Sequence, residues 1–253
     1  MSYVDFIRDQ IVQQLKSGKD GLDWIDQNGP AIIRTAMNVY LDTVLRLPIP
    51  GAITDRFADE AIAKLHEATA EIRSALEDAE KGIAYVGSPD RLRAAATAIG
   101  DKVIAPSRQL APQLVLGKLP STSSANWNDG EASEGYVRAV DGRQEAVVAV
   151  DTYANPISSA LGDLADAIEN YYLAVLAAVV GTVTAILGVV EAIIACVGVV
   201  TVPAAVIGII QAVLGGVAAA IGFYQVFIGA EQSARSITGN LSGTIPAWPR
   251  VLA

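Results

Sequence analysis

The chain has one histidine, His66, and one cysteine, Cys196, and a cysteine–histidine pair is a known nucleophilic arrangement. Cys196 lies within a long apolar run, however, and a thiol in such surroundings stays protonated and reacts slowly. We interpret His66, which lies among Glu60, Glu67 and Glu71, as a partly exposed surface residue. A single cysteine excludes a disulfide framework and a cysteine-based zinc site, and a single histidine excludes a histidine-rich metal site.

No other pattern in the sequence predicts a reaction. The glycine-rich segment 208–222 has neither the Lys-Ser/Thr ending nor the preceding strand of a phosphate-binding loop. Acidic residues number 27 against 18 basic ones, but no spacing singles out an acid–base pair. The net charge of −9 argues against a nucleic-acid-binding protein and against simple electrostatic docking on anionic lipid. We expect a non-enzymatic protein without a cofactor or metal.

Residues 171–230 form a long apolar run in which Glu191 is the only formally charged residue. A membrane-spanning helix needs about 20 apolar residues, so the run is long enough for two. A break near Val200, followed by Pro203, predicts two helices, 173–197 and 203–230, that form a hairpin. The tip of this hairpin carries no charge, which suits entry into a bilayer, and its residues are Val197, Val199, Val200, Val202 and Pro203.

Small residues recur along both predicted arms at spacings of four and three, which lets apolar helices approach closely. The predicted packing residues are Gly181, Gly188, Gly208, Gly215 and Gly222. Because a buried carboxylate needs a partner, we also predict that Glu191 approaches Gln211 across the hairpin. The alternative is that Glu191 lines a polar lumen in an oligomer.

The remaining segments all have helical patterns, so the sequence predicts an all-α, elongated helical bundle or coiled coil with an apolar hairpin near its C-terminus. We expect a first helix that is interrupted at Gly18 and Gly21, and a second that begins near Pro30. A seam with strict 3-4 spacing predicts a third helix, and its residues are Ile62, Leu65, Thr69, Ile72, Leu76, Ala79 and Ile83.

Two further helices are expected, one from Pro89 and one from about Gly130. The apolar seam of the later helix includes Ile157 and Leu164 and runs past Pro156, where we expect a kink, directly into the hairpin. The predicted regions are 1–87 (N-terminal helices), 88–170 (a helical hairpin), 171–230 (the apolar hairpin) and 231–253 (a tail).

The stretch from Trp127 through Gly130 to Tyr136 resembles the turn of the Trp-x-Gly family, the helical-hairpin substrates of actinobacterial type VII (ESX) secretion. The likeness covers about residues 88–172. The spacing is Trp-x-x-Gly, one residue longer than in the family, and the family's tyrosine followed four residues later by an acid is missing after the hairpin. The resemblance implies export with a secretion-system partner. The first ten residues lack a cationic region followed by an apolar one, so we expect no standard signal peptide.

The leading hypothesis is a secreted or surface-delivered helical protein whose apolar hairpin binds or enters a lipid membrane, as a homo-oligomer or an oligomeric pore. The arrangement also resembles helical pore-forming toxins, in architecture alone. One alternative is a resident membrane scaffold. The other is a soluble self-assembling protein that buries its hairpins against one another. None of the three includes a nucleic-acid partner.

Overall fold

The computed structural model describes residues 3–40, 51–84, 87–119, 130–196, 226 and 228–239. All regular structure in these residues is helical, which confirms the predicted all-α class. The chain divides by contact into two compact units. Unit 1 comprises residues 1–87 and 169–230, and unit 2 comprises residues 88–168 and 231–253. The helix α6, Arg143–Cys196, contributes residues to both units.

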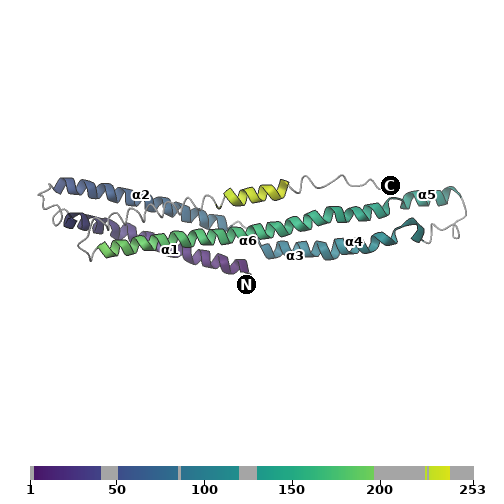
Figure 1. Cartoon of the computed structure of the whole chain (residues 1–253), viewed down its shortest axis with the longest axis horizontal. Coiled ribbons are helices and arrows are strands. Elements are labelled where there is room, and N and C mark those ends of the chain that lie inside the picture. The colour runs from purple at the N-terminus through teal and green to yellow at the C-terminus, as the bar shows by residue number, and fades with distance from the viewer. Residues whose placement is uncertain are drawn as a thin grey trace. The chain divides into compact units, whose positions relative to one another are not determined.

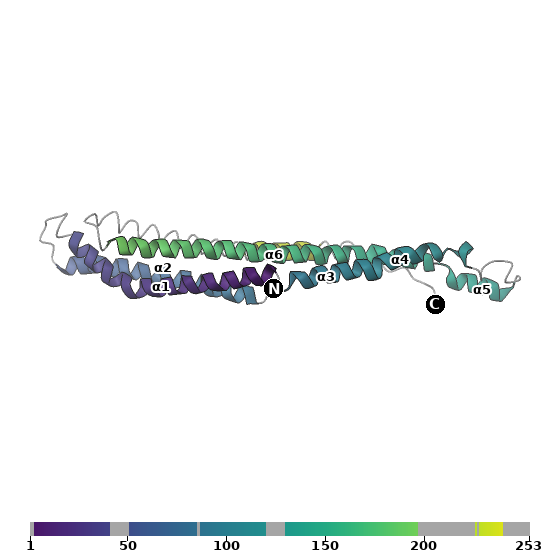
Figure 2. The same ribbon diagram turned by 90° about the horizontal axis from the view of Figure 1, so that it is seen from below.

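Unit 1 is built from α1 (Tyr3–Tyr40), α2 (Gly51–Ala84) and the C-terminal part of α6, which lie side by side in Figures 1 and 2. All seven residues of the predicted 3-4 seam on α2 are buried, so this prediction is confirmed. Apolar residues of α1 at helical spacing complete the core with them, and these are Ile7, Ile11, Leu15, Leu22, Ile25 and Ile33.

The expected interruption at Gly18 and Gly21 is wrong, because α1 runs through both glycines and through Pro30. A glycine inside a helix costs roughly 1 kcal/mol relative to alanine, so the helix must gain something there. The gain is close packing: a Cβ added at Gly21 would lie 2.7 Å from Cγ2 of Ile186. A Cβ at Gly18 would lie 3.1 Å from Cγ2 of Val183. The glycines therefore admit α6 rather than end α1.

Unit 2 contains α3 (Pro89–Ile99), a π-helical turn (Gly100–Ile104), α4 (Ala105–Leu110), two 3₁₀ turns (Ala111–Gln113 and Leu116–Lys118), α5 (Glu131–Val140) and the first part of α6. Polar contacts join α3 and α4 to α6. Arg93 pairs with Asp166 at 2.7 Å, and Ser158 Oγ donates a hydrogen bond to the Ala96 carbonyl at 3.0 Å. Residues 228–239 form a further helix.

Two details of the predicted later helix are corrected. A turn at Asp141 and Gly142, which has φ of 79°, separates α5 from α6, whereas α6 continues through Pro156. The predicted seam is confirmed in part: its residues Ala154 and Val175 are buried, but Ile157 is exposed and Ala165, one residue beyond Leu164, is buried. The strict heptad predicted for a coiled coil places Ile157 inward, but the hydrogen bond of Ser158 shows that the neighbouring position faces α3.

Candidate membrane-inserting helix and its covering helices

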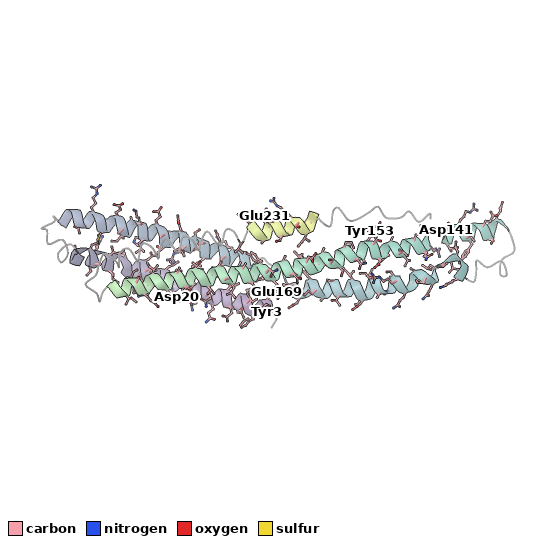
Figure 3. The ribbon with its side chains drawn as sticks, in the orientation of Figure 1. Tyr3, Asp20, Asp141, Tyr153, Glu169 and Glu231 are labelled. Atoms are coloured by element: carbon pink, nitrogen blue, oxygen red, sulfur yellow. The ribbon has the colours of Figure 1, made fainter. Side chains whose placement is uncertain are left out.

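The last part of α6 is the candidate functional element. Beyond Glu169, labelled in Figure 3, the helix carries Glu191 as its only formally charged residue. The helical span Glu131–Ile194 is long and apolar enough, by length and composition, to cross a membrane. The turn at Asp141 and Gly142 lies inside that span, so the apolar stretch belongs to α6. Core helices of soluble proteins can meet the same criteria and are mostly buried. Here only 33% of the 18-residue apolar stretch that meets them is buried.

One face of this stretch, here named the inner stripe, packs against α1 and α2. Its buried residues are Val175, Val179, Val183, Ile186, Val189 and Ile193. Contact with α1 is closest at Gly18 and Gly21, as described above. Contact with α2 is made at the start of the stretch, where the Tyr172 hydroxyl donates to the Ile83 carbonyl at 3.4 Å.

A second face, about 100° around the helix from the inner stripe, carries large apolar side chains that are exposed. We name these four residues the outer stripe: Leu173 (39% exposed), Val180 (41%), Leu187 (48%) and Ile194 (54%). They are spaced by seven residues, so they lie along one line of the helix. This part of α6 is therefore apolar on both faces, which is typical of helices that are covered on all sides or contact lipid.

Threonine hydroxyls in the apolar stretch are satisfied within α6 itself. Thr182 Oγ1 donates to the Ala178 carbonyl at 2.9 Å, and Thr184 Oγ1 donates to the Val180 carbonyl at 2.8 Å. These bonds persist wherever the helix moves as a unit. A helix that carries its own hydrogen bonds meets the main requirement for entering a hydrocarbon environment.

The helices that cover the inner stripe are joined to each other by charges. Lys19 pairs with Glu80 at 2.6 Å, and Arg34 pairs with Asp59 at 2.9 Å. A larger polar cluster lies between these two pairs. Along α1 the paired residues come in the opposite order to their partners along α2, as expected for antiparallel helices, and the pairs define how the two helices are aligned.

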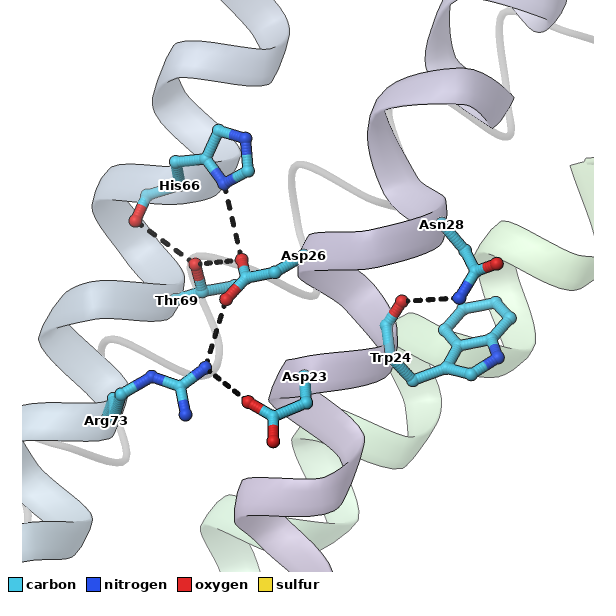
Figure 4. Close-up of polar contacts among 7 residues, drawn as sticks. All are labelled: Asp23, Trp24, Asp26, Asn28, His66, Thr69 and Arg73. Atoms are coloured by element: carbon cyan, nitrogen blue, oxygen red, sulfur yellow. Dashed lines mark hydrogen bonds and ion pairs between the residues drawn. The ribbon is translucent and has the colours of Figure 1, made fainter.

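Asp26 of α1 is the centre of the polar cluster, shown in Figure 4. Its Oδ1 accepts a hydrogen bond from Thr69 Oγ1 at 2.7 Å and lies 3.3 Å from His66 Nδ1. Its Oδ2 accepts a bond from Arg73 at 3.0 Å, and Arg73 also pairs with Asp23 at 2.8 Å. A surface pocket of about 310 Å³ borders the α2 side of this cluster.

The electrostatics of the cluster favour the charged form of Arg73. Partial burial acts to lower the pKa of its guanidinium, but the hydrogen bonds and charges of Asp23 and Asp26 outweigh burial and raise that pKa. The interpretation of His66 as partly exposed is confirmed, since 48% of its side chain is exposed. Sequence reasoning missed its neighbour Asp26, which is 40 residues away along the chain.

Among the predicted site residues, Gly181, Gly188 and Glu191 lie within the described part of α6, and all three are exposed. No described atom lies within 4 Å of a Cβ added at either glycine. Of the turn motif, Gly130 precedes the first residue of α5 and Tyr136 is half-buried within that helix. The other predicted residues lie outside the described residues, and these are Trp127, Val197, Val199, Val200, Val202, Pro203, Gly208, Gln211, Gly215 and Gly222.

Within the described part of the chain, no group of three or more His, Cys, Asp or Glu residues is placed to hold a metal ion. No protein-family model, curated protein or solved structure matches the chain.

Proposed function

We propose that this chain is a non-enzymatic helical protein whose apolar hairpin, residues 171–230, inserts into a lipid membrane. The observation that carries the proposal is the last part of α6, which is apolar on its inner and outer stripes alike. In water, α1 and α2 cover the inner stripe. In a bilayer, lipid chains would replace α1 and α2 as the cover of the inner stripe.

The way in which α6 is held supports release. Its inner stripe meets α1 through methyl groups packed over glycines, and apolar contacts of this kind are non-directional. The threonine hydroxyls keep their partners inside α6. Insertion therefore exchanges one apolar surrounding for another, while the charged contacts between α1 and α2 stay in water.

Delivery and assembly form a second part of the proposal. The Trp-x-x-Gly stretch supports export through a type VII route with a secretion-system partner, which would need no standard signal peptide. The protein would then be secreted or membrane-associated. Once α6 leaves α1 and α2, the apolar side chains of its inner stripe support association of inserted copies into a homo-oligomer or an oligomeric pore.

The test starts from the full chain extracted without detergent. The monomer is separated by size-exclusion chromatography with light scattering and then floated with vesicles of neutral phospholipid. We expect the wild type to float with the vesicles and Leu187→Asp to stay at the bottom, because a charge at the centre of a spanning helix costs about 3 kcal/mol. Ile157→Asp is the matched control: it is also exposed on α6 but lies outside the apolar stretch, so it should float.

The alternatives predict different results in the same experiment. A resident membrane scaffold would be extracted only with detergent. A self-assembling protein that buries its outer stripes would give a stable oligomer in water and would ignore the vesicles; the exposure of the outer stripe is the observation that favours this second candidate. Either result would overturn the insertion proposal.

A further inference from the structure

We infer that the outer stripe of α6 is the docking surface for the segment of the same chain that follows it, residues 203–225, in one antiparallel register. This inference deepens the proposed function, on which it rests, because it names the surface where the two arms of the inserting hairpin meet. The segment lies outside the described residues, so the argument uses the described surface of α6 and the sequence of the segment.

Large and small residues recur in a regular pattern on the exposed surface of α6. The side chains of the outer stripe stand at intervals of seven residues. Beside two of them are Gly181 and Gly188, both exposed, where a Cβ would meet no described atom. The surface thus alternates large apolar side chains with glycine hollows, which is a pattern that fits knobs into holes on a partner helix.

The segment that follows carries the complementary pattern. Its glycines at positions 208, 215 and 222 also recur every seven residues. One antiparallel register places each of them opposite an outer-stripe side chain, and the resulting pairs are Ile194 with Gly208, Leu187 with Gly215 and Val180 with Gly222. A large side chain over a glycine lets two backbones approach closely.

The same register also places large side chains of the segment opposite the exposed glycines of α6. It places Leu214 opposite Gly188 and Ile221 opposite Gly181, so each hollow on α6 faces a large apolar residue. It also places Gln211 opposite the exposed carboxylate of Glu191. An amide beside a carboxylate supplies the hydrogen-bond donor that a charge in apolar surroundings requires.

Chain length also favours this occupant over a second copy of the protein. Because α6 ends at Cys196, only residues 197–202 are needed to reverse the chain direction before Pro203. Such a tether gives the segment an effective concentration of roughly millimolar or above at the stripe.

Disulfide trapping in the full chain tests the register. In a Cys196→Ser background, the pair Leu187→Cys with Gly215→Cys is oxidised in water without lipid. The control pair, Leu187→Cys with Ala219→Cys, is displaced by one helical turn, about 5.4 Å along the axis. We expect an intramolecular disulfide that forms about tenfold faster in the first pair, because a disulfide requires Cα atoms within about 7 Å.

Two results would overturn the inference. One is equal rates for the two pairs, and the other is a disulfide-linked dimer of Leu187→Cys alone, which would show that a second copy covers the stripe. Circular dichroism checks that each variant folds, and Val180→Cys with Gly222→Cys repeats the test one heptad away if the first pair does not. Disulfide trapping is measured without lipid, and flotation of the wild type and Leu187→Asp needs no engineered cysteine, so failure of the register and failure of membrane insertion are distinguishable.

Discussion

The two interfaces of unit 1 are built from different interactions. Between α1 and α2, ion pairs and the polar cluster around Asp26 specify one alignment. Between α1 and α6, methyl groups of Val183 and Ile186 lie over Gly18 and Gly21. Charged contacts are directional and tie a side chain to one partner, whereas apolar contacts can be replaced by any apolar surrounding. The comparison indicates which helix is suited to leave: α1 and α2 form a fixed pair, and α6 is its exchangeable partner.

The largest expected effect comes from a charge placed between α6 and the pair. Ile186 is 1% exposed, so Ile186→Asp buries an unpaired carboxylate and should lower the free energy of unfolding by at least about 3 kcal/mol. Urea denaturation followed by circular dichroism measures this change. Ile157→Asp, exposed on the same helix, should change stability by no more than about 0.5 kcal/mol. Equal losses in the two variants would contradict the assignment of the inner stripe.

A smaller change loosens the same interface without adding charge. In Gly21→Ala the new methyl group would lie 2.7 Å from Cγ2 of Ile186, a β-branched side chain that yields little, so α6 must shift. We expect a net loss of about 1 kcal/mol despite the better helix propensity of alanine, and faster flotation with vesicles. Gly135→Ala has open space around its Cβ and should be neutral or stabilising. A Gly21→Ala variant as stable as the wild type would show that the contact is loose.

The polar cluster between α1 and α2 is tested by removing the positive charge of Arg73. Arg73→Gln removes the cation that pairs with Asp23 and Asp26 and should cost about 1 kcal/mol, since these groups are partly exposed. Because the pKa of Arg73 is raised by folding, this contribution is fully present below the unfolded-state pKa and is lost only as pH rises through the higher folded-state pKa. The loss in Arg73→Gln should thus be the same at neutral and mildly alkaline pH. Arg34→Gln, at a more exposed pair, should cost less than about 0.5 kcal/mol.

The smallest expected difference separates two buried threonines, one whose hydroxyl bonds across the α1–α2 interface and one whose hydroxyl bonds within α6. Thr69→Val removes a hydrogen bond across the fixed pair and should cost about 1 kcal/mol. Thr182→Val removes a bond that stays inside α6, so it should change stability by less than about 0.5 kcal/mol. Parallel thermal denaturation compares them. A larger loss in Thr182→Val than in Thr69→Val would reverse the ranking of the two interfaces.

Sequence patterns predicted the parts of this fold that depend on local spacing. The α2 seam is an example, because a 3-4 repeat of apolar residues determines a buried face wherever the partner lies. The continuity of α1 was missed because Gly18 and Gly21 are unfavourable locally and are explained only by contact with other helices: both meet α6, more than 160 residues later, and Gly18 also meets Leu76 of α2. The cluster around Asp26 was missed for the same reason. Its partners lie on another helix, and their approach depends on the antiparallel register of α1 and α2, which no local spacing encodes.

The central claim is that α6 must leave α1 before it enters a membrane, and a reversible lock tests this most directly. In a Cys196→Ser background, Gly18→Cys and Val183→Cys would join the two helices, because a Cβ at Gly18 lies 3.1 Å from Cγ2 of Val183. We predict that the oxidised protein stays behind when vesicles float, and that the same sample floats after the disulfide is reduced. Equal flotation of the oxidised and reduced forms would contradict the account.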